Sequence, residues 1–554
     1  MLTDMLAETP SERDRAQTPT LASPDLLHVE PLPRCDLAQT RLAVALAFAG
    51  GVSGGLFDEA LDGATLSPTT WEPSCFVDDL FLGAFVAKCF KVRIDGEDFA
   101  ISGKRTVRWL ARPPSDRRVV EHRRGILAEL VASPPLRRDV ERLYAALTRF
   151  RTGLEGALGP GRGDENRRQI DLLQQFKEIV DLAARLEPAR SGLRRLYEFG
   201  VRVQRGEPYR SLSDLLHYEE NLATLSLKVG VGADGRIRGF EITAVEANQK
   251  NPFVTSAPRR WLVKLELLLR GFHFGDGEVM AHLIDAVFQG VQDDVVRLVQ
   301  LLGDLELYLG ALGFHDQAKA AGVAVCLPEL VERDAPRVLR GLFNPLLVAA
   351  DVKVVPCDIE LDRHDTTVLI TGPNSGGKTR LLQSLGLAQL LAQSGLFIPA
   401  REGSLALARG MVVSLLQDVR DNQAEGRLGM ELLRIRDLFE RLLPGTVVIL
   451  DELCSGTNPS EGEEIFELVV RMLRQLKPQA FITTHFLTFA QRLERERKIE
   501  GLRFLQVELG DDQEPTYRFV GGVAKTSLAG QTATRLGVTG EELMKLIERN
   551  MRRA

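Results

Sequence analysis

The sequence predicts an α/β domain over residues 341–554, preceded over residues 41–340 by a mainly α-helical domain with a small β insertion. Three observations predict this fold class. A glycine-rich loop containing a lysine stands between an apolar strand and a helical segment, a second apolar strand ends in two acidic residues, and a long upstream stretch has apolar residues at helical spacing. Residues 1–40 are rich in Pro, Ser, Thr and acidic residues, and we expect them to form a disordered leader.

The glycine-rich loop satisfies the pattern G-x-x-x-x-G-K-[ST] in full, between an expected strand (368–371) and an expected helix (380–391). Its glycines let backbone N–H groups face a β-phosphate, its lysine places a charge on the β- and γ-oxygens, and its threonine hydroxyl can bind Mg²⁺. The pattern therefore predicts a P-loop NTPase that binds ATP, rather than a chance glycine-rich turn. The predicted nucleotide-binding residues are Gly372, Pro373, Asn374, Ser375, Gly376, Gly377, Lys378 and Thr379.

Two further strands complete the predicted site. Residues 447–450 are apolar, as in a parallel strand buried on both faces, and Asp451 and Glu452 follow them. With a P-loop upstream, we expect Asp451, with Thr379, to hold Mg²⁺ and Glu452 to polarise the attacking water as general base, although an acidic pair could also be only a helix cap. His485, near the end of a third apolar strand, is predicted either to sense the γ-phosphate or to be a structural histidine.

These motifs resemble a known family. The segments TGPNSGGKT, AQSGLFIPA (392–400), DELCSGTNPSEG (451–462) and TTH (483–485) together resemble the ATPase domain of MutS proteins, an ABC-type ATPase. The likeness is closest to the bacterial MutS-like subfamily that lacks mismatch-reading domains. It implies ATP and Mg²⁺ as cofactors, hydrolysis of ATP, and binding of DNA by a homodimer.

Weaker likeness extends the resemblance to roughly residues 80–554. Residues 522–550 resemble the helical C-terminal segment through which MutS ATPases dimerise, and we assign dimerisation to about 522–554. Residues 119–136 and 314–330 resemble the start and end of the MutS core helical domain. In that fold the helical body is a lever between the nucleotide site and a clamp.

Periodicity predicts the helical body independently of the family. Apolar residues step by three or four from Met280 to Leu309, which predicts one amphipathic helix of some 30 residues. Residues 116–131 and 167–186 have similar helical patterns. Between them and the long helix, alternating apolar residues and Asp234-Gly235 predict a β-hairpin near 225–245.

The sequence departs from MutS proteins in two ways. A leader and a short apolar stretch leave no room for mismatch-binding and connector domains, so we expect no direct mismatch reading. The end at Ala554 leaves no room for a nuclease-like domain. Phe57-Asp58-Glu59 matches the family's Phe-x-Glu wedge only by chance. The Ser-Thr-Phe stretch that contacts a neighbouring nucleotide in trans falls at 426–433, where Leu428 and Gly429 replace the hydroxyl residues and Arg427 is a possible substitute.

Charge is unevenly distributed along the chain. The net charge is −6, yet residues 104–168 contain 16 Lys/Arg against 8 Asp/Glu. This stretch is either a set of solvated helix faces or a surface that follows a polyanion. The candidate nucleic-acid contacts are Arg117, Arg118, Arg123 and Arg124.

Other features narrow the function. The N-terminus lacks the pattern of a signal peptide, and the longest apolar run, 42–57, is short for a membrane span, so we expect a cytoplasmic protein that does not contact membranes. No Leu-Ser-Gly-Gly-Gln signature of transporter ATPases lies in 379–450, and the short interval excludes a long coiled coil. The sequence predicts a homodimeric ATPase on branched or duplex DNA in repair or recombination control. An RNA- or ribosome-associated ATPase and a protein-binding switch remain the alternatives.

Overall fold

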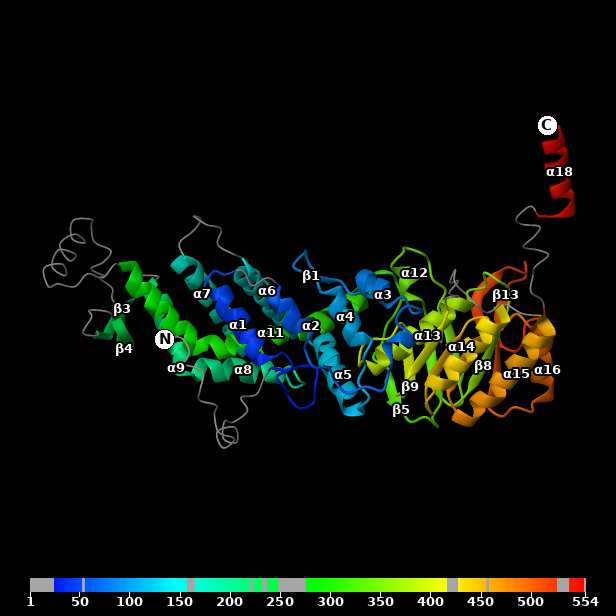
Figure 1. The fold of residues 1–554 in the computed structure, drawn as a ribbon, viewed down its shortest axis with the longest axis horizontal. Coiled ribbons are helices and arrows are strands. Elements are labelled where there is room, and N and C mark those ends of the chain that lie inside the picture. Colours follow the sequence, from blue (N-terminus) through cyan, green and yellow to red (C-terminus); the bar gives the residue numbers. More distant parts are fainter. Residues whose placement is uncertain are drawn as a thin grey trace. The chain divides into compact units, whose positions relative to one another are not determined.

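The computed structural model describes residues 24–51, 55–156, 165–219, 223–231, 237–247, 276–415, 427–454, 458–525 and 538–552 (Figure 1). They form two compact units, each assembled from two separate stretches of the chain. The first unit comprises Met1–Thr65 and Ala128–Leu305, and the second comprises Leu66–Leu127 and Glu306–Ala554. The domain boundaries predicted near residues 41 and 341 stay a prediction.

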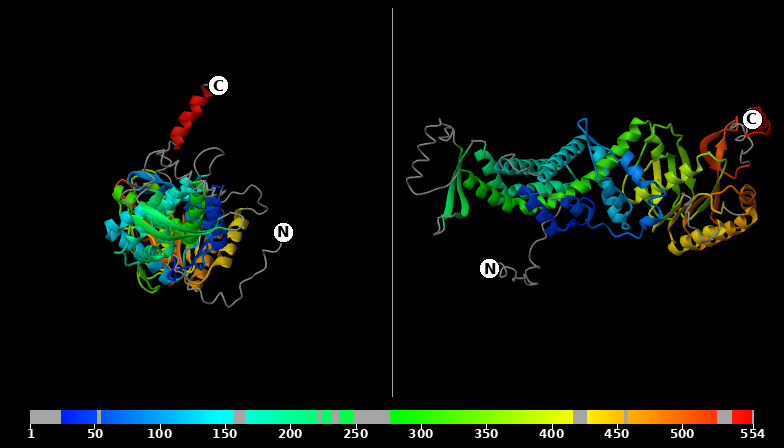
Figure 2. Two further views of the ribbon diagram at one scale, coloured as in Figure 1. Left: turned by 90° about the vertical axis from the view of Figure 1, so that its left-hand side faces the viewer. Right: turned by 45° about the horizontal axis from the view of Figure 1, so that its top comes forward.

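The first unit is mainly helical. Helix α6 packs against α7, and α7 against α8; the cyan helices of Figure 2 show this layer. Their apolar faces are buried, as 3.6-residue periodicity requires, for example at Val140, Leu143 and Leu147 of α6. The helices are α1 (Leu37–Phe48), α2 (Leu56–Asp62), α6 (Pro134–Glu155), α7 (Glu165–Ala184), α8 (Arg194–Arg205) and α9 (Glu207–Glu219).

The predicted long helix is confirmed and is longer than expected. Helix α11 (Asp276–Ala320) has 45 residues, of which those up to Leu305 belong to the first unit. Its predicted apolar stripe is buried, including Ile284, Val291 and Val295. The sequence pattern stopped near residue 309 because Gly310 and Gly313 follow, and glycine is a poor helix former.

Packing explains one of these glycines. A Cβ atom at Gly313 would lie 1.7 Å from the carbonyl oxygen of Lys91, which belongs to the same unit. The close approach of the Lys91 backbone leaves no room for a side chain at this position, so the helix has a glycine there.

The predicted β insertion is present. Strands β3 (Ala223–Val231) and β4 (Ile237–Ala247) pair antiparallel, with Lys228 opposite Glu241. The predicted turn residues Asp234 and Gly235 lie outside the described residues.

The structure differs from the sequence prediction at the end of the expected disordered leader. Asp25 is fully buried and Arg34 is 4% exposed. The Arg34 guanidinium forms ion pairs with Asp25 and with Asp304 of α11, and the Asp304 carboxylate accepts the backbone N–H of Leu26 at 2.9 Å. The composition of this stretch suggested a solvated chain, but Arg34 has a carboxylate partner, Asp304, 270 residues away in the sequence.

The second unit contains a six-stranded sheet of strand order β10-β11-β12-β8-β13-β14. Every neighbouring pair is parallel except β13 with β14. All residues of β8, β11 and β12 are buried, as expected for strands covered on both faces. The strands are β8 (Thr367–Thr371), β10 (Met411–Ser414), β11 (Val447–Leu450), β12 (Gln479–Thr483), β13 (Leu502–Leu509) and β14 (Pro515–Gly521).

Helices connect and cover these strands (Figure 1). They are α13 (Lys378–Gln393), α14 (Arg427–Arg441), α15 (Pro459–Leu476) and α16 (Leu487–Glu496). Helix α13 follows β8 after the loop at 372–377 and contacts β11 and β12, and 14 of its 16 residues are buried. This alternation of parallel strands and helices is the predicted α/β P-loop fold, which is confirmed.

A second, four-stranded sheet of order β5-β9-β6-β7 lies in the same unit. Residues 66–127 are held to the rest of this unit by long-range hydrogen bonds: Trp71 Nε1 donates to the Ala408 carbonyl, and Gln393 Nε2 donates to the Pro114 carbonyl. The remaining elements are α3 (Leu82–Cys89), β1 (Val92–Ile94), β2 (Glu97–Phe99), α4 (Gly103–Leu110), α5 (Arg117–Ala132), β5 (Glu329–Val331), β6 (Arg337–Leu342), α12 (Pro345–Val348), β7 (Cys357–Leu361), β9 (Glu402–Ala406) and α18 (Gly540–Met551).

None of the helices in the described ranges is both long and apolar enough to cross a bilayer.

Candidate nucleotide-binding site

The predicted site residues follow three neighbouring parallel strands. Strand β12 lies between β11 and β8, and the loop at 372–377 follows β8 directly. Asp451 follows β11, and Thr483 ends β12. Because the carboxyl ends of parallel strands meet at one edge of a sheet, these residues come together there, where ligands of such folds bind.

The loop has a backbone that only its glycines permit. Gly372 has φ of 142°, and a Cβ atom there would lie 2.6 Å from Cγ2 of Val507. Gly377 has φ of 85° and is the N-cap of α13. The N-terminus of a 16-residue helix therefore stands at the loop, where its free N–H groups favour an anion.

The lysine of the loop is buried and held by the loop itself. Lys378 is 7% exposed, and its Nζ donates to the carbonyl oxygens of Gly372 and Pro373, both at 3.0 Å. Burial lowers the pKa of Lys378, while the nearby Glu452 and Asp451 act to raise it. Its ammonium group thus stands beside two carboxylates, within the loop that would hold phosphates.

The acidic pair is connected to the loop through hydroxyl groups. Thr379 Oγ1 donates to Asp451 Oδ2 at 2.5 Å, and Thr483 Oγ1 donates to Asp451 Oδ1. The backbone N–H of Glu452 donates to Thr483 Oγ1 at 2.8 Å. The structure thus brings Thr379, Asp451 and Glu452 together, and it adds Thr483, which sequence reasoning did not assign to the site.

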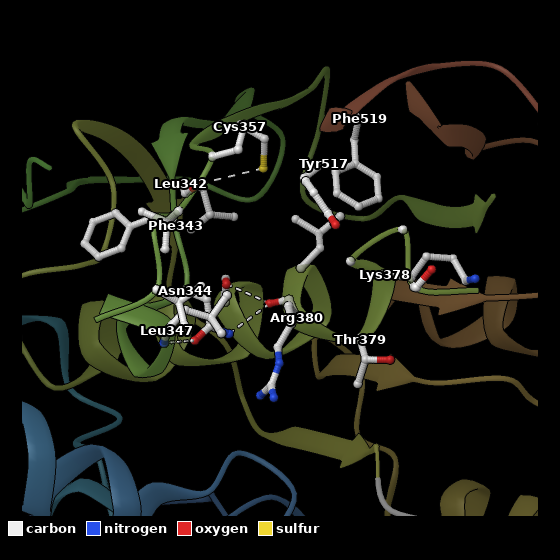
Figure 3. Close-up of a pocket in the computed structure, with 18 of the residues that line it drawn as sticks. Leu342, Phe343, Asn344, Leu347, Cys357, Lys378, Thr379, Arg380, Tyr517 and Phe519 are labelled. Atoms are coloured by element: carbon white, nitrogen blue, oxygen red, sulfur yellow. Dashed lines mark hydrogen bonds between the residues drawn. The ribbon is translucent and has the colours of Figure 1, made fainter. Parts of the chain in front are cut away.

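A cavity of about 620 Å³ opens beside the loop (Figure 3). The loop residues from Asn374 to Thr379 and Glu452 line one part of it. Apolar and aromatic side chains line another part, namely Leu342, Phe343, Leu347, Tyr517 and Phe519. This volume is in the range of small-molecule sites, and the division between polar and apolar walls suits a ligand with phosphates at one end and a flat ring at the other.

Sequence reasoning missed the apolar wall. Tyr517 and Phe519 lie on β14, and a Cβ atom at Gly377 would be 3.3 Å from the Tyr517 ring. Phe343 follows β6, 29 residues before the loop begins at Gly372. No spacing in the sequence joins these segments, because the sheet topology brings them to the cavity.

Comparison with known proteins agrees with this geometry. Residues 368–550 match the family model MutS domain V. This region of the chain is therefore similar to the MutS family. The match contains the loop, the acidic pair and His485, so the resemblance predicted from these motifs is confirmed.

Several relatives carry the name Endonuclease MutS2. The protein of Pelotomaculum thermopropionicum is 32% identical over 250 residues, which are 45% of this chain and 30% of the relative. That of Lactobacillus helveticus is 36% identical over 228 residues, 39% of this chain and 27% of the relative. That of Clostridium tetani is 32% identical over 238 residues, 42% of this chain and 29% of the relative. Each match thus spans less than a third of the relative's length.

His485 is described by its exposure and by one ring contact. It follows the end of β12, its side chain is exposed, and its ring centroid is 4.2 Å from that of Phe486. It is not among the residues that line the cavity beside the loop. Its role as a γ-phosphate sensor stays a prediction.

The segment that replaces the trans contact of MutS proteins is partly outside the described residues. Helix α14 begins at Arg427, but the side chains of Arg427 and Leu428 are not described. Gly429 is half-buried. The suggestion that Arg427 substitutes for the missing hydroxyl groups stays a prediction.

The four candidate nucleic-acid arginines begin α5 and have different environments. Arg117 forms ion pairs with Glu121 and Glu332, which raise its pKa, and Arg118 pairs with Asp116. Arg123 is only 6% exposed. A phosphate could reach Arg117 and Arg118 from solvent, whereas Arg123 is part of the packed interior.

Packing explains why Arg123 is inside. A Cβ atom at Gly395, in the turn after α13, would lie 2.8 Å from the Cβ of Arg123, so the two backbones pass close together. Arg124 is half-buried, and burial lowers its pKa. The basic stretch 104–168 is divided between the two units: residues 104–127 belong to the second unit and residues 128–168 to the first.

Proposed function

We propose that this chain hydrolyses ATP at the P-loop site and uses the reaction to switch a homodimer on structured or branched DNA. The observation that carries the proposal is the arrangement at one sheet edge. The lysine-containing loop and the Glu452 carboxylate line one side of a cavity large enough for a nucleotide, and the Thr379 hydroxyl of that lining donates to the Asp451 carboxylate. Known MutS ATPases use ATP, which the family resemblance makes the expected nucleotide.

The side chains have distinct parts in this proposal. The loop N–H groups and Lys378 bind the β- and γ-phosphates, since a buried ammonium interacts strongly with an anion. Thr379 Oγ1 and the Asp451 carboxylate, 2.5 Å apart, are suited to hold Mg²⁺. The bound ion would neutralise charge on the phosphate oxygens. Glu452 lines the cavity and accepts the proton of the attacking water.

The apolar wall would position the other end of the nucleotide. Tyr517 and Phe519 offer aromatic faces on which a purine can stack, and Leu342 and Phe343 exclude water there. Stacking tolerates different bases, so the wall favours a purine ring without reading its edge by hydrogen bonds.

Helix α18 supports the proposed homodimer. None of its residues is buried, and even its apolar side chains are exposed: Leu543 is 42%, Met544 56% and Ile547 51% exposed. Thr539 caps its start by accepting the backbone N–H of Glu542 at 3.3 Å. A capped helix with an exposed apolar side is expected to pack against another surface, and the family resemblance of 522–550 assigns that surface to a second copy.

DNA binding rests on the family and on the Arg117–Arg118 end of α5. Contacts of this kind go to phosphates and read shape and charge rather than base identity. We therefore expect equal affinity for perfect and mismatched duplexes. The relatives are named endonucleases, which is a statement about those proteins. Among the described residues of this chain, no three or more His, Cys, Asp or Glu side chains form a cluster that could hold a metal ion.

A competition assay tests this function. The full chain is titrated with a labelled four-way junction at fixed salt, with linear duplex, a G·T duplex, single strands and ribosomes as competitors. We expect the junction to bind most tightly, because two arms can engage two protomers. A matched chain that ends at residue 537 should be monomeric by light scattering and lose the junction preference. A preference for the G·T duplex, or competition by ribosomes alone, would contradict the proposal.

A further inference from the structure

We propose that Thr483 is a positioning residue for hydrolysis, whose hydroxyl holds the Asp451 carboxylate and the Glu452 backbone in their working arrangement. The inference rests on the proposed ATP hydrolysis and adds a residue that acts through the two acidic residues rather than on the nucleotide.

The sheet places Thr483 between the two parts of the site. Strand β12, which Thr483 ends, lies between β11, before the acidic pair, and β8, before the phosphate loop. The last residue of β11, Leu450, pairs with Ile482, so Asp451 and Thr483 are each one residue beyond that pair. This register brings the threonine hydroxyl to the carboxylate without any contribution from a flexible loop.

The hydroxyl of Thr483 makes two hydrogen bonds to the acidic pair. It donates its single proton to Asp451 Oδ1 and accepts the backbone N–H of Glu452 at 2.8 Å. Thr483 is 0% exposed, so water does not replace either bond from solvent. Loss of the hydroxyl would leave a backbone N–H without its acceptor and one carboxylate oxygen without this donor.

Asp451 is held by a threonine on each oxygen. Thr379 Oγ1 donates to Oδ2, while Thr483 donates to Oδ1. Because Thr379 is the proposed Mg²⁺ ligand, its hydroxyl oxygen must serve the ion when the site is loaded. Thr483 then remains the side chain that orients the carboxylate.

The Glu452 backbone also needs the contact. Its φ of 48° lies in the left-handed region, where a residue with a side chain is strained by about 1 kcal/mol or more. Such a conformation persists only when its surroundings fix it. The Thr483 hydroxyl fixes the N–H of Glu452, and the N–H of Asp451 donates to the Ser414 carbonyl at 2.9 Å. The direction of the Glu452 side chain follows from this backbone.

The neighbouring threonine does not share the role. Thr484 is also fully buried, but its Oγ1 accepts the backbone N–H of Phe486 at 3.1 Å. Thr446 provides a better control, because it is 2% exposed and precedes β11 at the opposite end of that strand. Its hydroxyl accepts the N–H of Leu443 at 3.3 Å.

The test compares Thr483→Val, which keeps the shape and removes the hydroxyl, with Thr483→Ser, which keeps the hydroxyl, and with Thr446→Val. Steady-state ATP hydrolysis by the full chain is measured against ATP and Mg²⁺ concentration, with urea unfolding in parallel. We expect T483V to lower kcat by roughly 10- to 100-fold, the usual effect of removing a residue that orients a metal ligand. Its KM for ATP should change by less than about threefold, because phosphate binding by the loop is unaltered.

The other variants separate positioning from packing. The Mg²⁺ concentration for half-maximal rate should rise about tenfold in T483V. T483S should keep kcat within about threefold of the unchanged chain, and T446V should keep it within about twofold. We expect T446V and T483V to lower the free energy of unfolding by similar amounts. In a chain that already carries Glu452→Gln, T483V should have a much smaller effect, since both changes act through one group. If T483V does not fold, Thr483→Ala replaces it under the same criteria.

The outcomes distinguish the inference from the function on which it rests. A wild-type chain without ATP hydrolysis overturns the proposed function. Wild-type hydrolysis with normal kcat in T483V overturns only the role of Thr483. A T483S variant as slow as T483V, or a T446V variant equally slow, shows that packing rather than the hydroxyl is responsible.

Discussion

Lys378 and Arg337 are both buried cations of the second unit, and they have opposite surroundings. Lys378 is 7% exposed and lines the cavity beside the loop. Asp451 and Glu452 act to raise its pKa, and the carbonyl oxygens of Gly372 and Pro373 accept hydrogen bonds from its ammonium group. An anion in the cavity could therefore approach the Lys378 ammonium group.

Arg337, on β6, is fully buried. Its Nη1 donates to the side-chain oxygens of Gln389 on α13, at 3.0 Å, and of Gln479 at the start of β12. Its guanidinium lies 5.4 Å from the centre of the Phe481 ring. Burial lowers the pKa of Arg337 to about 9, so it is still charged at neutral pH.

The difference teaches that burial of a cation does not by itself mark a functional site. Lys378 stands beside carboxylates and an open cavity, so an incoming phosphate can satisfy it. Arg337 is enclosed by neutral amides and an aromatic ring, and it joins α13, β12 and β6. We infer that Lys378 serves nucleotide binding and that Arg337 serves the fold.

The largest expected effect is on nucleotide binding. Lys378→Ala should lower ATP affinity and turnover together by about 10²–10³-fold, as expected when a single preorganised donor to developing charge is lost. Urea unfolding should change little, because among the described residues the ammonium group donates to two loop carbonyls and not to another secondary-structure element. Equilibrium dialysis with labelled ATP measures the affinity, and Lys88→Ala, an exposed lysine of α3, is the control. Normal affinity in K378A would remove the distinction between the two cations.

The next effect is on stability. Arg337→Ala should lower the free energy of unfolding by about 3–5 kcal/mol, because it leaves a cavity and two glutamine oxygens without their donor. Arg337→Met keeps most of the volume without a buried charge and should recover more than half of that loss. Urea unfolding of both variants is the measurement. If R337A instead weakened ATP binding at unchanged stability, Arg337 would belong to the nucleotide site.

A smaller effect comes from His364, next to Arg337. Its Nε2 accepts the backbone N–H of Ala406 at 2.9 Å, so Nδ1 carries the proton toward the Ala335 carbonyl, 3.0 Å away, and the ring is neutral. Burial, and secondly Arg337, lower the pKa of His364 to about 4.

The pH dependence follows from this direction. Between about pH 6.5 and pH 4 the unfolded chain binds a proton at His364 that the folded chain does not, so stability falls as the pH is lowered through this window. The loss between pH 7 and pH 5 should be about 2 kcal/mol. Urea unfolding at both pH values measures it, and His364→Gln should reduce the difference. An equal pH dependence in H364Q would assign it to other groups.

The same contrast explains what sequence can predict. The loop, Asp451 and Glu452 were predictable because phosphate and metal chemistry impose residue types at short spacings after a strand. The long helix was predictable from its period. Arg337, Thr483 and Tyr517 were not, because their partners lie far away in sequence and sheet order alone brings them together.

Charged segments were the hardest to predict. Arg34 and Asp25 lie in a stretch with the composition of a solvated leader, yet they are buried with Asp304. Arg123 counted toward a basic surface but is inside. A local charge count does not contain the distant partner that decides between burial and exposure.

The most direct measurement of the central claim is a single-turnover assay of Glu452→Gln, in which phosphate release and ATP binding are followed in the same sample with Mg²⁺. Glutamine keeps the size of the side chain and cannot accept the proton of water. We predict unchanged ATP and Mg²⁺ binding with hydrolysis slowed by about 10²–10⁴-fold, the usual contribution of a general base. Phosphate release at the wild-type rate would contradict the account.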